Sequence, residues 1–436
     1  MGCTVLKNIN SDRYQSFFSE RINLGFNFVA GCFAFVIASC LFKTFFSSFF
    51  SVLVFFGSVY ICTRARLLGS QPLFNKIGLI LFCFIFLSIF WSDNNLWQSL
   101  RFLSEYRSFL LIPLVSFSFY LARSQSVVTV CFVVGCIIAL LFSYGLGLGL
   151  FKITGAELSL ANRIFHGFLM SIFGYGLLVA GLNVDDTRLK FLLYACAVLS
   201  IYNIINVETG RTGYILMVSL GCLLIVLANR PVRALAGISI LICSLMLAYF
   251  VFETFGNRVT YTVVNAYEFV FGDSSAVLQT SAGNRLEFYT KAFGFGLENP
   301  FFGVGVGSVE DLLRIKYEVG EISVLTDNVH NEYINMFLIG GFPALTLYIS
   351  YLVAIFAYGY KFKSTRSKPL GWLFMGVAVW IGCASMFNSS VKDFGDKQLI
   401  ILVLSWLVSS AMAMEKGIDP LASLRKICLR GNKQHT

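Results

Sequence analysis

Residues 126–151 read SVVTVCFVVGCIIALLFSYGLGLGLF, a stretch in which no side chain is charged. An α-helix rises about 1.5 Å per residue, so about 20 apolar residues cross the ~30 Å hydrocarbon layer of a membrane. The stretch is therefore long enough to be a transmembrane helix. The whole chain has this character, because 57% of its residues are apolar and only 13% are charged. A soluble domain does not have this composition, and the sequence predicts an all-α polytopic membrane protein.

Similar apolar stretches recur along the chain and predict about twelve transmembrane helices. We place them at residues 24–42, 45–62, 73–91, 102–121, 126–151, 164–182, 189–206, 212–228, 234–252, 329–359, 370–388 and 398–414. Short connections join the first nine helices over residues 1–252. A large loop at 253–328 follows, then three further helices at 329–414 and a basic tail at 415–436.

The basic residues of the short connections indicate the orientation of the chain. Lys and Arg gather on alternate connections, and with a cytoplasmic N-terminus these connections and the basic tail all lie in the cytoplasm. The large loop then lies on the opposite side. We interpret the net charge of +10 as this topology signal and as contact with anionic membrane lipids. Nucleic acid is not expected as a partner, since no basic stripe alternates with exposed aromatic residues.

The large loop reads as the one soluble part of the chain. Residues 284–297 and 308–318 each predict a short helix with polar and apolar faces. Between them, Gly303-x-Gly305-x-Gly307 fits either a backbone cradle for phosphate or a tight turn that packs closely. The run lacks the Lys and the strand-turn-helix setting of a nucleotide site, so the tight turn is the favoured interpretation.

Charged side chains on the non-cytoplasmic face are the candidates for chemistry. Arg211 begins a span, Arg285 begins a helix of the large loop, and His330 opens the tenth span. A lone arginine at a span end is usually an interfacial anchor, and a lone histidine is more often structural than catalytic. Arg163 and His166 begin the sixth span, and Asp393 lies between the last two. Their gathering on one face favours a functional site.

Physical chemistry narrows the reaction that such a site performs. A guanidinium binds phosphate oxygens through paired hydrogen bonds and stays charged, so two arginines suit a diphosphate. Outside the cytoplasm no nucleotide is available to activate a sugar for transfer. A lipid-linked diphosphate sugar is already activated by its diphosphate. Its leaving group gains negative charge that arginines stabilise, while His330 is placed to deprotonate a sugar hydroxyl. No paired carboxylate motif and no Cys/His cluster is present, so neither a metal nor another cofactor is expected.

Several motifs resemble those of bacterial O-antigen ligases and polymerases. They are His330-Asn331-Glu332-Tyr333 with Gly340-Gly341, Arg285 ahead of Pro300 to Gly307, and Gly210-Arg211-Thr212-Gly213. The stretch from Asn388 to Gly395 is more similar to the ligase branch. One departure is Ala344, since the ligase pattern has Gly, Thr or Val there.

The resemblance implies an enzyme at the periplasmic face of the bacterial inner membrane. In that family a metal-independent glycosyl transfer moves a glycan from undecaprenyl diphosphate, and ligases pass it to lipid A–core. The resemblance implies that Arg211 and Arg285 engage the diphosphate and that His330 is catalytic. The further candidates for positioning either substrate are Arg163, His166, Asn331, Glu332 and Asp393.

Three alternatives remain at this point. An O-antigen polymerase, or a related oligosaccharyl transferase, would use the same donor and the same residues with a second lipid-linked glycan as acceptor. A lipid-glycan transporter would normally show repeated halves and charges near the bilayer midplane, and neither is evident in the sequence. A non-enzymatic assembly scaffold would tolerate changes at Arg285 or His330.

Overall fold

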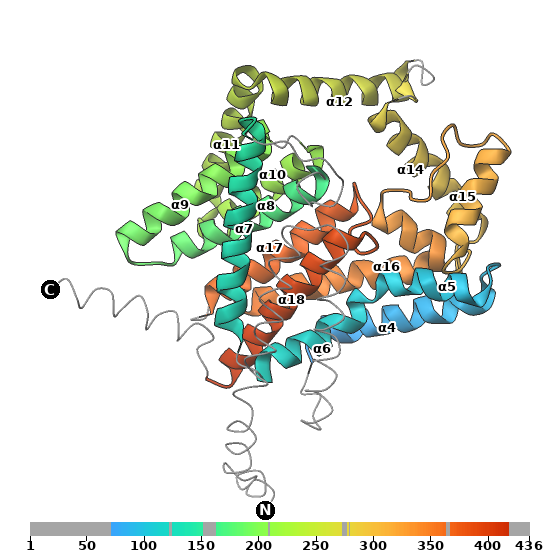
Figure 1. Ribbon diagram of the computed structural model, residues 1–436, viewed down its shortest axis with the longest axis horizontal. Coiled ribbons are helices and arrows are strands. Elements are labelled where there is room, and N and C mark those ends of the chain that lie inside the picture. Colours follow the sequence, from blue (N-terminus) through green and yellow to red (C-terminus); the bar gives the residue numbers. More distant parts are fainter. Residues whose placement is uncertain are drawn as a thin grey trace, which may run out of the picture.

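The computed structural model describes residues 71–121, 124–150, 163–207, 210–272, 277–278, 280–362 and 367–417, and every regular element in them is helical (Figure 1). The predicted all-α class is therefore confirmed for this part of the chain. The spans predicted at 24–42 and 45–62 lie outside the described residues, as does the basic tail beyond residue 417.

Nine helices in the described residues are long and apolar enough to cross a membrane. They are α4 (Leu73–Leu87) continued by η1 (Ser88–Trp91), α7 (Gln125–Gly147), α8 (Arg163–Leu182), α9 (Thr187–Tyr202) continued by the π-helical turn η4 (Asn203–Val207), α10 (Arg211–Ala228), α11 (Pro231–Val251), α16 (Glu332–Lys361), α17 (Lys368–Ser385) and α18 (Phe394–Glu415). Each of the nine corresponds to a span expected from the sequence.

The span predicted at 102–121 differs from its prediction. The chain forms α5 (Leu96–Leu103), then η2 (Ser104–Tyr106), and only then an apolar helix, α6 (Ser108–Leu121), which is shorter than the other spans. Glu105 and Arg107 lie in or next to η2. Because burying a charge in hydrocarbon is costly, the helix that enters the apolar layer begins after these two residues.

The segment between α11 and α16 contains three described helices. The two predicted ones are present as α14 (Ser281–Glu298) and α15 (Ser308–Glu318). The third, α12 (Glu253–Phe271), was not expected from the sequence. Phe252 alone separates it from α11 and caps both helices, so the chain turns from one helix into the next without a longer linker.

A break in α16 explains the glycine run that precedes α15. Gly340 and Gly341 leave helical geometry, and Gly341 has φ 63° and ψ −158°, a conformation open essentially to glycine alone. Two N–H groups of the glycine run fill the break, because Val304 donates to the Leu338 carbonyl at 2.7 Å and Gly305 to the Ile339 carbonyl at 3.0 Å. These N–H groups are thus occupied, and the tight-turn interpretation is confirmed.

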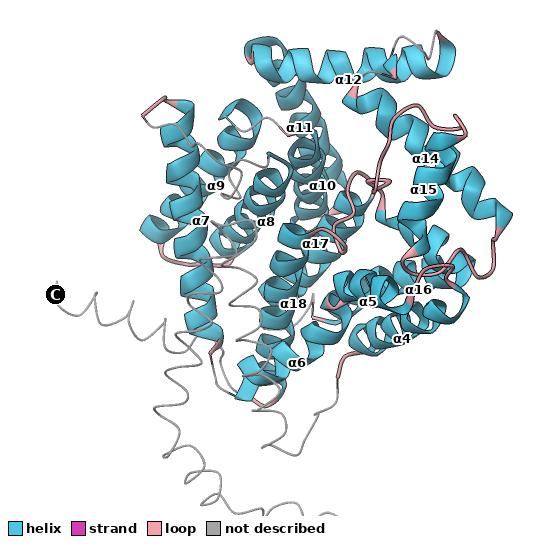
Figure 2. Cartoon of the chain, turned by 45° about the vertical axis from the view of Figure 1, so that its right-hand side comes forward, coloured by secondary structure: helices cyan, strands magenta, loops and turns pink. Residues whose placement is uncertain are grey.

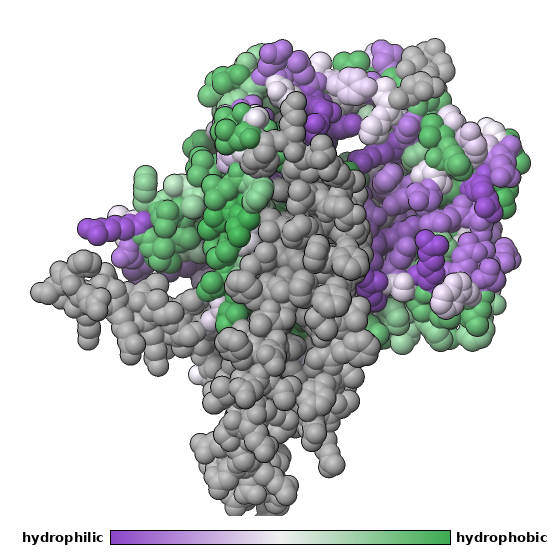
Figure 3. Space-filling model, viewed as in Figure 1, coloured by the Kyte–Doolittle hydropathy of each residue, from purple (hydrophilic) through white to green (hydrophobic). Residues whose placement is uncertain are grey.

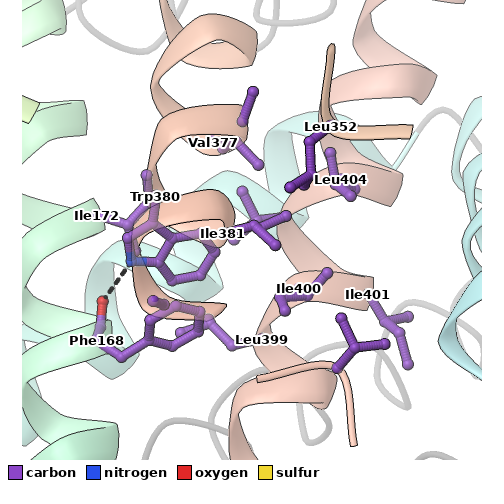
Figure 4. Packing of buried hydrophobic residues seen from close by; sticks show 14 of the residues in the cluster. Phe168, Ile172, Leu352, Val377, Trp380, Ile381, Leu399, Ile400, Ile401 and Leu404 are labelled. Carbon is purple, nitrogen blue, oxygen red and sulfur yellow. Dashed lines mark hydrogen bonds between the residues drawn. The ribbon is translucent and has the colours of Figure 1, made fainter. Parts of the chain in front are cut away.

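The interior around α17 is densely packed. Trp380 stacks on Phe168 of α8 with ring centroids 3.7 Å apart, and its Nε1 donates to the Phe168 carbonyl at 2.9 Å (Figure 4). Leu399, Ile400 and Leu404 of α18 close the same cluster. A buried indole is tolerated here because its N–H has a partner.

The helices divide the surface into apolar and polar regions. Helices α16, α17 and α18 lie centrally, with α7 to α11 on one side and α4 to α6 on the other (Figure 1). In Figures 1 and 2, α12 runs across the top of the molecule and leads into α14. Polar residues gather over α14, α15 and α5, whereas apolar residues cover α7 and the edge formed by α4 (Figure 3).

The break in α16 predicts that Gly341→Ala is strongly destabilising. The change adds backbone strain of roughly 1–3 kcal/mol, and the new Cβ would lie 2.4 Å from the Pro300 carbonyl oxygen. Gly320→Ala is the matched control, because Gly320 also has a positive φ, +76°, but no atom lies within 4 Å of its added Cβ. Thermal unfolding of the purified protein should show a clearly larger loss for Gly341→Ala. Equal losses would contradict the role given to the break.

Candidate active site

His330 has a strained backbone that its neighbours hold in place. Its φ is 56°, and no other described non-glycine residue has a positive φ. Such a conformation costs roughly 1–3 kcal/mol and persists only where surrounding contacts enforce it. Here the His330 N–H donates to Oδ1 of Asn328 at 2.9 Å, and the Tyr289 hydroxyl donates to the His330 carbonyl at 3.0 Å. Strain fixed in this way is typical of functional sites.

The His330 imidazole is set up as a proton acceptor. Its Nδ1 is buried and makes no hydrogen bond with any residue that the structure describes. Burial and the positive charge of Arg285 lower the pKa of His330 below 6.5, against the opposing charge of Asp327. Because the neutral ring then predominates at pH 7, His330 can take a proton from a bound hydroxyl.

Asn331 and Glu332 contact the protein itself. Asn331 caps α16, since its Oδ1 accepts from the Ile334 N–H at 3.1 Å, and its Nδ2 donates to the Met386 carbonyl. Glu332 is fully buried, and its Oε2 accepts from the N–H groups of Val391 at 3.2 Å and Lys392 at 3.3 Å. Both side chains therefore anchor the start of α16 to the segment that precedes α18.

That segment, the 388–393 loop, brings Asp393 and Lys392 toward the histidine. Asn328 donates to Oδ1 of Asp393 at 3.3 Å. Burial raises the pKa of Asp393 to about 6, although the charge of Lys392 opposes the shift. Lys392 reaches Glu310 of α15 at 3.5 Å and Glu105 at 3.8 Å. The loop thus ties α15, η2 and α16 together beside His330.

A small hollow lies between α5, α15 and α16. The charged side chains that line it are Glu105, Glu310 and Lys392, and both carboxylates pair with Lys392. Phe102 lines it too, and Lys392 lies over that ring with Nζ 5.8 Å from the ring centroid. The hollow therefore borders the 388–393 loop.

Close helix packing brings Arg211 and Arg163 to the same end of the bundle. Arg211 is the first residue of α10, and α8 begins at Arg163. A Cβ on Gly210 would lie 2.7 Å from the Arg163 carbonyl oxygen, and one on Gly167 would lie 3.0 Å from the Gly213 Cα. Only glycine permits this approach, which explains the glycines of the Gly-Arg-Thr-Gly turn.

Arg285 links the arginines to the histidine. It lies four residues before Tyr289 on α14, so the two side chains share a helix face, and Tyr289 contacts His330. The charge of Arg285 acts on both His330 and Arg211. The structure therefore brings together three candidates that are far apart in the sequence.

His166 has different surroundings from this cluster. It is buried within α8, and its Nε2 lies 2.7 Å from Oδ1 of Asn203 in η4. Asn203 in turn donates to Ser143 of α7. These contacts join three helices through a satisfied polar network, whereas the Arg163 side chain is exposed at the start of the same helix.

Sequence reasoning missed the residues that position the histidine. Asn328 and Tyr289 hold its backbone, and Asn388 and Lys392 act on its ring. One signal was available for Asn328, because an asparagine side chain commonly bonds the backbone two residues on. Asn388 and Lys392 lie in the stretch from Asn388 to Gly395 whose similarity to the ligase branch was a signal, whereas Tyr289 comes from a remote part of the chain and carried none.

Comparison with known proteins identifies one family. Residues 195–349 match the family model described as O-antigen ligase. No curated protein matches the chain significantly. The matched segment contains Arg211, Arg285 and His330. The match confirms the resemblance to the O-antigen ligase family that the sequence motifs indicated.

Proposed function

We propose that the protein is an O-antigen ligase that transfers a glycan from undecaprenyl diphosphate to lipid A–core at the periplasmic face of the bacterial inner membrane. The observation that carries the proposal is the cluster of Arg211, Arg285 and a strained His330 whose Nδ1 has no hydrogen-bond partner among the described residues. The basic connections and tail support cytoplasmic N- and C-termini.

The proposed reaction is an inverting glycosyl transfer. The oxygen of an acceptor sugar hydroxyl attacks the anomeric carbon of the donor, while the bond from that carbon to the diphosphate oxygen breaks. The hydroxyl proton passes to the neutral imidazole of His330, and the bond electrons leave with the lipid diphosphate. Arg211 and Arg285 bind that diphosphate as its negative charge grows.

The remaining candidates take supporting roles in this proposal. Asn331 and Glu332 fix the start of α16 and therefore the direction of the His330 ring. Asp393 lies on the same polar network and is suited to orient the acceptor. Arg163 is placed beside the turn that carries Arg211 and is suited to the donor glycan or its diphosphate.

Substitutions at His330 and Arg285 should abolish most glycan transfer without unfolding the protein. We expect His330→Asn to lower the rate about 10²- to 10⁴-fold through loss of the base. Asparagine tolerates a positive φ, so the backbone should persist. Arg285→Ala should cost about 10²- to 10³-fold.

The matched control is Arg314→Ala, because Arg314 is a surface arginine paired with Asp311 at 2.7 Å. Its transfer rate should equal that of the wild type. Glycan transfer by purified protein, with protein levels and thermal stability checked, measures all three. Near-wild-type transfer by His330→Asn or Arg285→Ala would contradict the mechanism.

The pH dependence of kcat/KM should report on His330. Its neutral form is the base, so the rate should fall as pH falls through its pKa, which lies below 6.5. Arg285 lowers this pKa, so Arg285→Ala should move the acidic limb to higher pH. Asp393 titrates nearby, with its pKa at about 6. If His330 is the source of the acidic limb, the Asp393→Asn variant should still show that limb. Loss of the limb in this variant would assign it to Asp393.

Genetic complementation separates the ligase from its alternatives. In a strain that lacks its O-antigen ligase but retains its polymerase, the protein should restore lipopolysaccharide ladders, and the His330→Asn form should not. A polymerase-deficient strain tests the alternative, because long chains in place of single repeat units there would make the protein a polymerase. Ladders restored equally by His330→Asn would favour the scaffold.

A further inference from the structure

Helix α12 is fixed against the two helices that precede it. Phe255 meets Tyr214 of α10 edge to face, with ring centroids 4.8 Å apart. A Cβ on Gly256 would lie 2.5 Å from the carbonyl oxygen of Tyr249 in α11, so the backbones approach closely there. The Tyr249 hydroxyl also lies 2.8 Å from the Thr260 hydroxyl. These contacts define the position of the first turns of α12.

The aromatic contact places a third arginine beside Arg211. Residues three apart share one face of a helix. Arg211 lies three residues before Tyr214, and Arg258 lies three residues after Phe255. The ring contact therefore brings the two arginine-bearing faces together, and the charges of Arg285 and Arg258 both act on Arg211. Figures 1 and 2 show how α12 runs over the bundle before α14 begins.

This positive charge has no counterion in the described part of the protein. Among the residues that the structure describes, no carboxylate forms an ion pair with Arg211, Arg258 or Arg285. All three side chains are half-buried, so solvent screens their repulsion only in part. Like charges held together at such a cost fit an anion that is bound between them.

We propose that Arg258 contacts the diphosphate of the lipid-linked donor together with Arg211 and Arg285. This inference rests on the proposed function and adds a residue from α12, outside the motifs that indicated the site. A diphosphate has enough oxygens to accept hydrogen bonds from three guanidinium groups. Helix α12 thereby forms one wall of the donor site, to which α14 contributes Arg285.

Binding of farnesyl diphosphate to the detergent-solubilised, full-length protein tests the proposal without requiring transfer. We expect Arg258→Ala to weaken binding about 10- to 100-fold, as for loss of a charged hydrogen-bonding partner. Arg258→Lys keeps the positive charge but loses the paired hydrogen-bond donors of the guanidinium, so its affinity should lie between those of the wild type and Arg258→Ala. Arg314→Ala should bind as the wild type does, and farnesol should bind none of them measurably.

The outcomes separate the inference from the function on which it rests. Unchanged affinity in both folded Arg258 variants, with weakened binding in Arg285→Ala, would overturn the role of Arg258 alone. A wild-type protein that does not distinguish farnesyl diphosphate from farnesol would overturn the donor chemistry as well. In transfer assays, the inference also requires Arg258→Lys to raise the KM for the lipid-linked donor while leaving that for the acceptor unchanged.

Discussion

The side-chain amide of Asn328 is the interaction on which the site depends. Its Oδ1 accepts from the His330 N–H and from the Ser389 hydroxyl, and its Nδ2 donates to Asp393. One buried group thus joins the segment before α16, the histidine and the 388–393 loop. Loss of any partner would leave polar atoms unpaired in a site shielded from water, which is costly. The strained backbone of His330 persists because this network and Tyr289 both hold it.

The second constraint is the positive charge of a cluster of three arginines. Arg211, Arg258 and Arg285 come from α10, α12 and α14, and they share no carboxylate among the described residues. Such an arrangement lowers stability while the site is empty and favours an anion when one enters. One of the three, Arg285, also adds to the effect of burial in lowering the pKa of His330, so it prepares both the donor site and the base.

Individual helices show how far a local sequence pattern predicts the structure. The sequence 308–318 predicted α15 with its observed bounds, because Glu310 and Asp311 stand in the first turn, where they suit the helix dipole. Helix α12 escaped prediction, since its exposed face mixes Val264 and Tyr267 with polar residues. The span at 102–121 was placed too early because Glu105 and Arg107 stand within an otherwise apolar stretch.

By itself, the sequence determined the all-helical membrane class, the placing of nine spans in the described residues and the choice of Arg211, Arg285 and His330 as candidates. These follow from composition and from motifs whose physical requirements are local. Only the tertiary structure decided which candidates meet. It placed His166 in a buried network, used Glu332 to anchor a loop and brought Arg258 to Arg211. Such contacts join residues that are remote in the chain, and helix packing alone sets the distances between them.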